Sequence, residues 1–211
     1  MKVKLEDISL PTEWKQISVY ELERIYQIDT ETGAQYFNNI IHILSDLSLE
    51  IINQLEEESM NVLFKHLEYV YTPETYEIKK GHTWEIDGEI YGIIEDDMAL
   101  QEWVETIKFE TDADILGNIT SILPVVIRKV QTEAFGEYIL EPFDFKYADI
   151  NSKILSNHFN AVDVFSIVVF FWEFAQTLSK SIVGSLASLT AKEEQKTGIV
   201  TDGDGLLLDG K

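Results

Sequence analysis

Cysteine is absent from this sequence of 211 residues. The chain therefore has no disulfide, no thiolate ligand for a metal and no cysteine nucleophile. A chain without cysteine fits a cytosolic or virion environment, where structural disulfides are rare.

Basic residues are scarce. The chain has 16 Lys and Arg against 38 Asp and Glu, so its formal net charge is −22 at pH 7. Such a field repels phosphate backbones and anionic membrane surfaces, and it keeps the chain in solution even where an apolar patch is exposed. Nucleic-acid binding needs clustered Lys and Arg to displace counterions. We therefore expect no nucleic-acid partner and no membrane partner, with acidic DNA mimics as the exception.

The sequence contains no recognisable catalytic constellation. Its four histidines form no His-Glu-x-x-His motif, and no two of them share one helical face. His42 lies in an apolar segment, where we predict a core or boundary residue. Asp202–Gly205 resembles part of a calcium loop, but it lacks the third ligand before the glycine and the bidentate glutamate at the end.

Other enzyme signatures are missing as well. There is no glycine-rich phosphate loop and no Gly-x-Ser-x-Gly elbow. The sequence neither supports nor excludes a glycosidase-type pair among its many carboxylates, and we favour solvated acidic faces. We predict that the chain is not an enzyme and uses no metal and no cofactor.

Targeting signals are also lacking. The first residues, Met1–Asp7, have no apolar core of the signal-peptide type. Asp163 and Glu173 bracket an apolar run of nine residues, about half of the ~20 that a bilayer crossing needs. We therefore predict a helix of a soluble protein there, not a membrane span.

Helical patterns fill the N-terminal part. Ser18 and Glu21 have the spacing of a capping box before a helix that reaches about Ile28. Three further helices are predicted at Ala34–Asp46, at Ser48–Leu55 and from Ser59 onwards, the last with a stripe of Leu63, Leu67 and Val70.

The period changes at Pro73. Tyr76–Lys79 alternates, and Asp87-Gly88 separates the strand-like runs Thr83–Ile86 and Glu89–Ile94. This dipeptide is the typical signal for a hairpin with a type I′ turn. Helices are predicted again at Ala99–Phe109, Asp114–Lys129 and Tyr147–Ser156, with a short strand at Glu137–Leu140.

These patterns predict a single α+β domain, mostly helical, over residues 1–190. A small antiparallel hairpin (about 74–95) is inserted between two helical halves, and a long apolar helix lies near the C-terminus. Residues 191–211 are acidic and glycine-containing, and we predict a flexible acidic tail there.

A nearly all-round apolar segment, Phe159–Leu189, is the most distinctive feature of the chain. A helix that is hydrophobic on every side is buried on every side, or it lends one face to a partner. Core packing is predicted for five of its side chains: Phe165, Val168, Val169, Trp172 and Ile182. Phe170, Phe171 and Phe174 point in other directions around the helix.

Read in order, several segments resemble the bacteriophage tail assembly chaperones, a family of small proteins encoded among tail and virion-assembly genes. The opening Leu10–Val19 is similar to the family pattern LPxxWxxITL. One position departs from the family pattern: after the segment that ends at Arg128 the family often continues into Arg-Pro, whereas this chain has Lys129. The other matching segments are Ile40–Ser48, Trp84–Tyr91, Ile119–Arg128, Glu137–Phe143 and Phe170–Phe174.

The resemblance implies a non-enzymatic chaperone in the host cytoplasm. Its client would be the helical tape-measure protein or another tail protein, whose apolar stripes aggregate before the tail tube forms. Aromatic side chains dominate interface energies. The candidate partner-binding anchors are Phe165, Phe170, Phe171, Trp172 and Phe174, with a second contact at Leu206, Leu207 and Leu208.

Two other classes of function stay open. In the first, the chain is a structural virion component, such as a ring, connector or tail-completion subunit, in which the apolar face joins copies of a homo-oligomer. In the second, it is an acidic decoy of a host nucleic-acid-binding or immune protein. A decoy needs carboxylates spaced like phosphates on one face, whereas these are spread along many elements.

Overall fold

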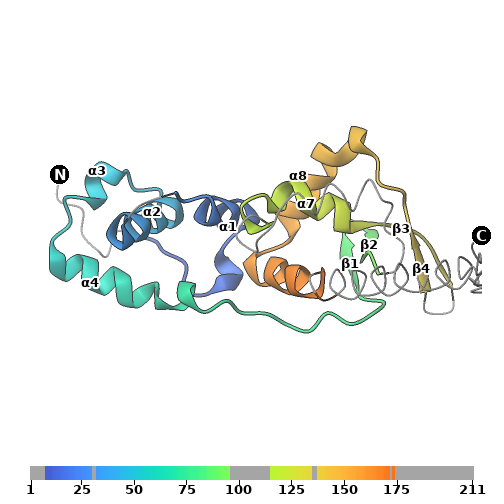
Figure 1. The fold of residues 1–211 in the computed structure, drawn as a ribbon, viewed down its shortest axis with the longest axis horizontal. Helices are drawn as coiled ribbons and strands as arrows, with labels where there is room; N and C mark the ends of the chain where they lie inside the picture. Colours follow the sequence, from blue (N-terminus) through green and yellow to red (C-terminus); the bar gives the residue numbers. More distant parts are fainter. Residues whose placement is uncertain (1–7, 30–31, 96–114, 135–136, 172, 174–211) are drawn as a thin grey trace, which may run out of the picture. The chain divides into compact units, whose positions relative to one another are not determined.

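A computed structural model describes residues 8–29, 32–95, 115–134, 137–171 and 173 (Figure 1). The chain divides into two units, Met1–Phe171 and Trp172–Lys211. Helices and an antiparallel sheet form the first unit, so the predicted α+β class, mostly helical, is confirmed. The described part of the second unit is Glu173, an exposed helical residue. The predicted domain end at residue 190, the predicted helix Ala99–Phe109 and the predicted tail lie outside the described residues.

Short helices make up the N-terminal part. The predicted capping box of α1 is present, because Ser18 Oγ accepts from Glu21 N at 3.2 Å and Glu21 Oε2 accepts from Ser18 N at 2.8 Å. α4 begins two residues before the predicted Ser59, with acidic residues in a first turn whose dipole favours them. The elements are η2 (Trp14–Gln16), α1 (Val19–Tyr26), α2 (Gly33–Ser45), α3 (Leu49–Ile52), α4 (Glu57–His66) and η3 (Glu68–Tyr71).

His42 closes the C-terminal end of α2. Its Nδ1 lies 2.6 Å from the Leu47 carbonyl oxygen, so an N–H on Nδ1 donates to this oxygen. Asp46 takes a left-handed conformation with φ 57° and ends the helix. The side chain is half-buried, so of the two predicted positions, core or boundary, His42 takes the boundary one.

The sheet has four antiparallel strands in the order β1-β2-β3-β4: β1 (Thr83–Ile86), β2 (Glu89–Ile93), β3 (Ile127–Ala134) and β4 (Glu137–Leu140). Asp87 and Gly88 both have positive φ, 53° and 78°, as a type I′ turn requires. The predicted hairpin strands and the predicted strand at Glu137–Leu140 are confirmed. The hairpin is not a separate small insertion, however, because β2 also pairs with β3 and makes it part of a four-stranded sheet. The alternating segment Tyr76–Lys79 is not a strand.

Gly92 of β2 leaves room for the side chain of Tyr138, which belongs to β4. A Cβ atom at Gly92 would lie 2.7 Å from Tyr138 Cε2 and 3.1 Å from Leu140 Cδ2. The Tyr138 ring therefore lies over this glycine, and its hydroxyl donates to the Ile93 carbonyl oxygen at 2.6 Å. An aromatic ring over a strand glycine restores packing that the missing side chain cannot provide.

The predicted helix Asp114–Lys129 is wrong in its last three residues, Ile127–Lys129, which belong to a strand. α7 (Ile119–Val126) ends where β3 begins, with no loop between them. Pro124 has no backbone N–H to donate to Thr120, so the last turn is weakened. The strand starts at the β-branched Ile127, and Val130 and Thr132 follow it, which favours a strand. A short apolar run reads equally well as a buried helix or a buried strand, which explains the error.

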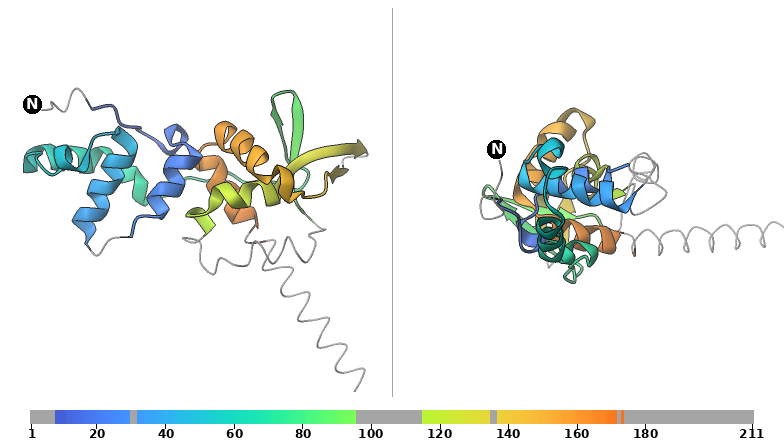
Figure 2. Two further views of the ribbon diagram at one scale, coloured as in Figure 1. Left: turned by 90° about the horizontal axis from the view of Figure 1, so that it is seen from above. Right: turned by 90° about the vertical axis from the view of Figure 1, so that its left-hand side faces the viewer.

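Thr120 joins α7 to two other helices. Its carbonyl oxygen, which Pro124 leaves without a helical donor, accepts from Ser152 Oγ at 2.6 Å. Its N–H and Oγ1 donate to Glu23 Oε1 of α1 at 3.1 and 2.7 Å. Ser152 belongs to α8 (Ala148–His158), which follows η4 (Phe145–Tyr147) and matches the predicted helix Tyr147–Ser156. α7 and α8 lie side by side (Figure 2).

The described part of the predicted apolar helix covers residues 161–171; we call it the apolar helix. Asn160 caps its start by accepting from Val162 N at 2.9 Å, and Asp163 Oδ2 accepts from Asn160 N at 3.0 Å. The two capped helix starts are adjacent, because Ser18 and Asn160 form a β-bridge and Ala161 N donates to the Ile17 carbonyl oxygen at 2.9 Å. Among the described residues, no helix is long and apolar enough to cross a membrane.

Trp14 connects the N-terminal segment to the apolar helix. Only 2% of its surface is exposed. Its Nε1 donates to the carbonyl oxygens of Tyr69 at 3.1 Å and Thr72 at 2.9 Å. Its ring meets Phe165 edge to face, with 4.8 Å between the centroids. The buried indole thus has hydrogen-bond acceptors for its N–H and an aromatic neighbour for its ring.

The Thr120 hydrogen bonds give a test with an internal control. Ser152→Ala leaves the Thr120 carbonyl oxygen without a donor, and we expect it to lower the free energy of unfolding by about 1–3 kcal/mol. Ser156, one turn later on α8, is buried but its Oγ has no hydrogen-bond partner among the described residues. Ser156→Ala removes no bond, so we expect a neutral or slightly stabilising effect. Urea unfolding of both variants measures this, and equal losses would contradict the assignment.

Candidate functional site

The structure places three of the predicted anchors. Phe165 and Phe171 are 4% and 6% exposed, so both belong to the core of the first unit. Phe170 is half-buried. Val169, predicted to be a core residue, is 48% exposed. The remaining predicted residues lie outside the described part of the chain: Trp172, Phe174, Ile182, Leu206, Leu207 and Leu208.

Phe165 has a packing role that accounts for its burial. Besides Trp14, its ring meets Tyr26 of α1, with 6.4 Å between the centroids. It therefore packs the apolar helix against α1 and η2. In this conformation it offers no surface to a partner, whereas Phe170 and Val169 do.

A cluster of aromatic side chains lies on α2, α4 and η3. Phe37 of α2 is buried and lies 5.2 Å from the ring of Phe64, which in turn lies 6.0 Å from the ring of Tyr71. Phe64 is 47% exposed and Tyr71 is 52% exposed. The pKa of Tyr36 is raised by burial and by the neighbouring Tyr71. We call these four residues the α4 aromatic surface.

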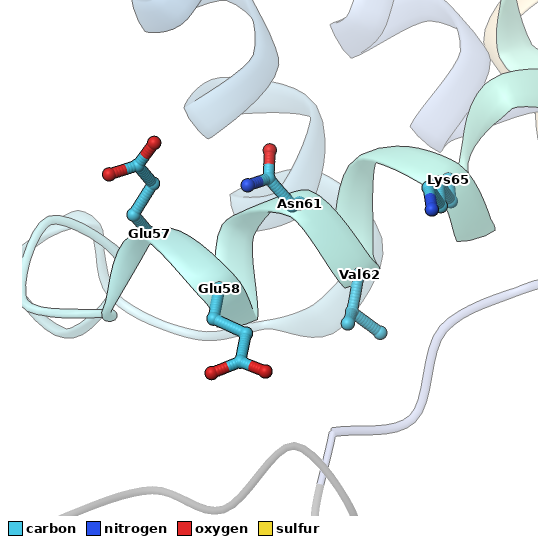
Figure 3. Close-up of a pocket in the computed structure, with 5 residues that line it drawn as sticks. All are labelled: Glu57, Glu58, Asn61, Val62 and Lys65. Carbon is cyan, nitrogen blue, oxygen red and sulfur yellow. The ribbon is translucent and has the colours of Figure 1, made fainter.

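Polar and acidic side chains border this surface. Figure 3 shows Glu57 and Asn61 projecting from one side of α4, and Glu58 and Val62 from another. With Lys65 they line an open hollow along the helix. Phe64 follows Glu57 and Asn61 at i+7 and i+3, so the three share one side of α4.

Sequence periodicity missed this surface for an identifiable reason. The predicted stripe consists of Leu63, Leu67 and Val70; the first two are buried, 4% and 1% exposed, and Val70 is half-buried. Phe64 and Tyr71 stand beside that stripe at a spacing of seven. Aromatic residues next to a complete apolar stripe were the available signal, because a helix of this kind needs no second apolar row for its own core.

A second exposed group lies at η4 and the start of α8. Phe145 and Tyr147 are 52% and 47% exposed, and Ile150 is 56% exposed. Phe143 packs edge to face on Phe145 at 4.6 Å, and Lys146 Nζ lies 5.2 Å from the Tyr147 ring centroid. This group matches the α4 aromatic surface in exposure but carries a cation beside its rings.

A row of rings runs from the hairpin to α8. His82 lies 6.2 Å from Tyr76 and 4.5 Å from Trp84, and Trp84 lies 5.3 Å from Phe159. Tyr76 Oη donates to Asp163 Oδ1 at 3.0 Å. The carboxylate of Asp163 is thus shared between a helix cap and a phenol. This arrangement ties the segment after Pro73 to the apolar helix.

Metal-binding chemistry finds no support in the part of the chain that the structure describes. No group of three or more His, Cys, Asp or Glu side chains there is arranged to hold a metal ion. Comparison with protein-family models, with curated proteins and with solved structures gives no match for this chain.

Tyr76 gives a pH prediction. The pKa of Tyr76 is raised from 10.0 to about 12, mainly by burial; a hydrogen bond to Trp84 lowers it, and the charge of Asp163 and the hydrogen bond to Asp163 raise it. The neutral phenol is favoured in the fold, so its contribution to stability is complete below pH 10 and is lost as the pH rises through about 12.

The measurement is a phenolate absorbance titration of the wild type minus that of Tyr76→Phe. We expect a midpoint near 12 in the folded protein and near 10 in concentrated urea. A folded-state midpoint near 10 would show that this hydroxyl is neither buried nor paired with Asp163.

Proposed function

We propose that this chain is a non-enzymatic chaperone of bacteriophage tail assembly that works in the host cytoplasm. It binds an apolar helical segment of the tape-measure protein, or of another tail protein, and keeps it in solution. The observation that supports this most is the α4 aromatic surface, in which Phe64 and Tyr71 are half exposed on a strongly acidic chain. The ordered resemblance of the sequence to that family points to the same function.

Burial of these rings supplies a useful but modest energy. An aromatic side chain buries about 150–250 Å² in total, so a half-exposed ring offers roughly 100 Å² to a partner. At about 25 cal/mol per Å², each ring contributes about 2.5 kcal/mol. Two such rings bind a client with moderate affinity and little sequence specificity. A chaperone that must release its client requires both properties.

Negative charge suits the same role. Copies of the loaded protein repel one another at a net charge of −22, which opposes aggregation of the exposed client. Phe170 and Val169 add exposed apolar area on the apolar helix. Trp172, Phe174 and Leu206–Leu208 remain candidate contacts by sequence.

A structural virion component is the second candidate. The group Phe145, Tyr147 and Ile150 favours it, because two separate exposed apolar groups on one chain suit contacts between neighbouring subunits. In that case the purified protein forms a discrete ring without any client.

The test uses co-expression with the tape-measure protein of the same tail gene cluster. We expect Phe64→Ser with Tyr71→Ser to reduce the soluble, co-purified client at least about tenfold, since about 2.5 kcal/mol of contact energy is lost per ring. The readout is the amount of client that co-purifies per chaperone.

The matched control is Phe145→Ser with Tyr147→Ser, which removes a phenylalanine and a tyrosine of the same exposure from the other group. This control should retain the client. Circular dichroism and urea unfolding verify that both double variants stay folded. Full capture by the Phe64/Tyr71 variant would exclude the α4 aromatic surface as the client site, and loss in both variants would favour contacts at both groups.

A further inference from the structure

We infer that the α4 aromatic surface selects a cationic amphipathic helix, in which an apolar stripe is bordered by Lys or Arg about three turns apart. This inference rests on the proposed function and specifies the chemistry of its client segment. Aromatic contacts alone accept any apolar helix, so the selection must come from the charges around the rings.

The segment that carries the surface is more acidic than its helical pattern requires. Residues 54–78 contain six glutamates and one lysine, Lys65. With histidine neutral, the net charge of this stretch is −6 + 1 = −5. A partner that approaches Phe64 and Tyr71 meets this negative field before it meets the rings.

Two of these glutamates, Glu57 and Glu68, flank Phe64 along the chain, while Glu58 projects from another side of α4 (Figure 3). Glu57 and Glu58 stand in the first turn of α4, and Glu68 follows Phe64 by four residues at the start of η3. All three side chains are exposed. Among the described residues, none of them takes part in an ion pair or a hydrogen bond.

The helix dipole accounts for part of this pattern. Acidic residues in the first turn of a helix are stabilised by its dipole, which favours Glu57 and Glu58. The dipole does not neutralise Glu57 and Glu58. Glu68 is the first residue of η3, which has only four residues and therefore a weak dipole to favour it. Acidic groups on both sides of an exposed aromatic pair match the rim-and-centre arrangement of a binding surface.

The spacing of the rim defines the partner. Glu57 and Glu68 are eleven residues apart in the sequence, which corresponds to roughly 16 Å along a helix. A partner helix that lies along α4 spans the same distance in about three turns. Cations near both ends of such a stretch, with Leu, Ile or Phe between them, pair with the two acidic ends while the apolar stripe covers the rings.

The experiment uses three synthetic peptides of about 18 residues, long enough for about five helical turns. The first has a leucine stripe bordered by lysine. The second has the same stripe bordered by glutamate. The third has the composition of the first in a scrambled order, which controls for general attraction to an acidic protein. Affinities are measured by calorimetry with the full-length protein.

We expect the lysine-bordered peptide to bind, and the other two to bind at least about tenfold more weakly. Glu57→Gln, Glu58→Gln and Glu68→Gln together should weaken its binding about tenfold, and about 500 mM salt should do the same. The control variant neutralises three exposed carboxylates elsewhere, Glu85→Gln, Glu141→Gln and Asp149→Asn, and should bind as the wild type does.

Each contrary result has a distinct meaning. Equal binding of the lysine- and glutamate-bordered peptides, still lost in Phe64→Ser with Tyr71→Ser, overturns the charge selection and leaves the proposed function standing. Equal effects of the two neutralised variants also overturn it, because general attraction then explains the affinity. Binding of the lysine peptide that is indifferent to Phe64 and Tyr71 counts against the site itself. A change of solution mass in the Phe64/Tyr71 variant without peptide would assign the surface to a second copy of the chain.

Discussion

The burial of Trp14 is the constraint on which the rest of the first unit depends. Its indole N–H donates to two carbonyl oxygens at the end of η3, and its ring packs on Phe165 of the apolar helix. One side chain thus holds together three segments far apart in the sequence. The bridge between Ser18 and Asn160 adds a backbone link at the same place. Two positive helix ends lie close together there, and Glu21 and Asp163 place a carboxylate at each.

A second constraint connects the helices to the sheet. Pro124 lies three residues before the start of β3 and has no N–H to donate to the Thr120 carbonyl oxygen. The Ser152 hydroxyl donates to this oxygen instead. Helix α7 and strand β3 are therefore a continuous element whose direction is set by α1 and α8 through Thr120. Because the Thr120 carbonyl oxygen accepts from Ser152, the buried proline does not leave an unsatisfied carbonyl group, which would lower stability.

The proposed function depends on aromatic side chains that are not buried in the core. Phe165 and Phe171 are buried in the core. Phe64 and Tyr71, in contrast, are about half exposed, in a segment rich in glutamate. An apolar centre with an acidic rim combines contact energy with solubility. The proposed charge selection would draw on the same net negative charge that, from the sequence, predicts no nucleic-acid partner.

The sequence by itself determined the local features: the capping box of Ser18 and Glu21, the turn at Asp87-Gly88 and the strand Glu137–Leu140. Each depends on residues a few positions apart, so periodicity and turn chemistry suffice. Only the tertiary structure decided that Val125 and its neighbours lead into a strand, that Val169 faces outward while Phe171 is buried, and that the aromatic surface lies on α4. A short apolar run carries no information on which neighbour will cover it, because burial is a property of the packed chain rather than of the segment.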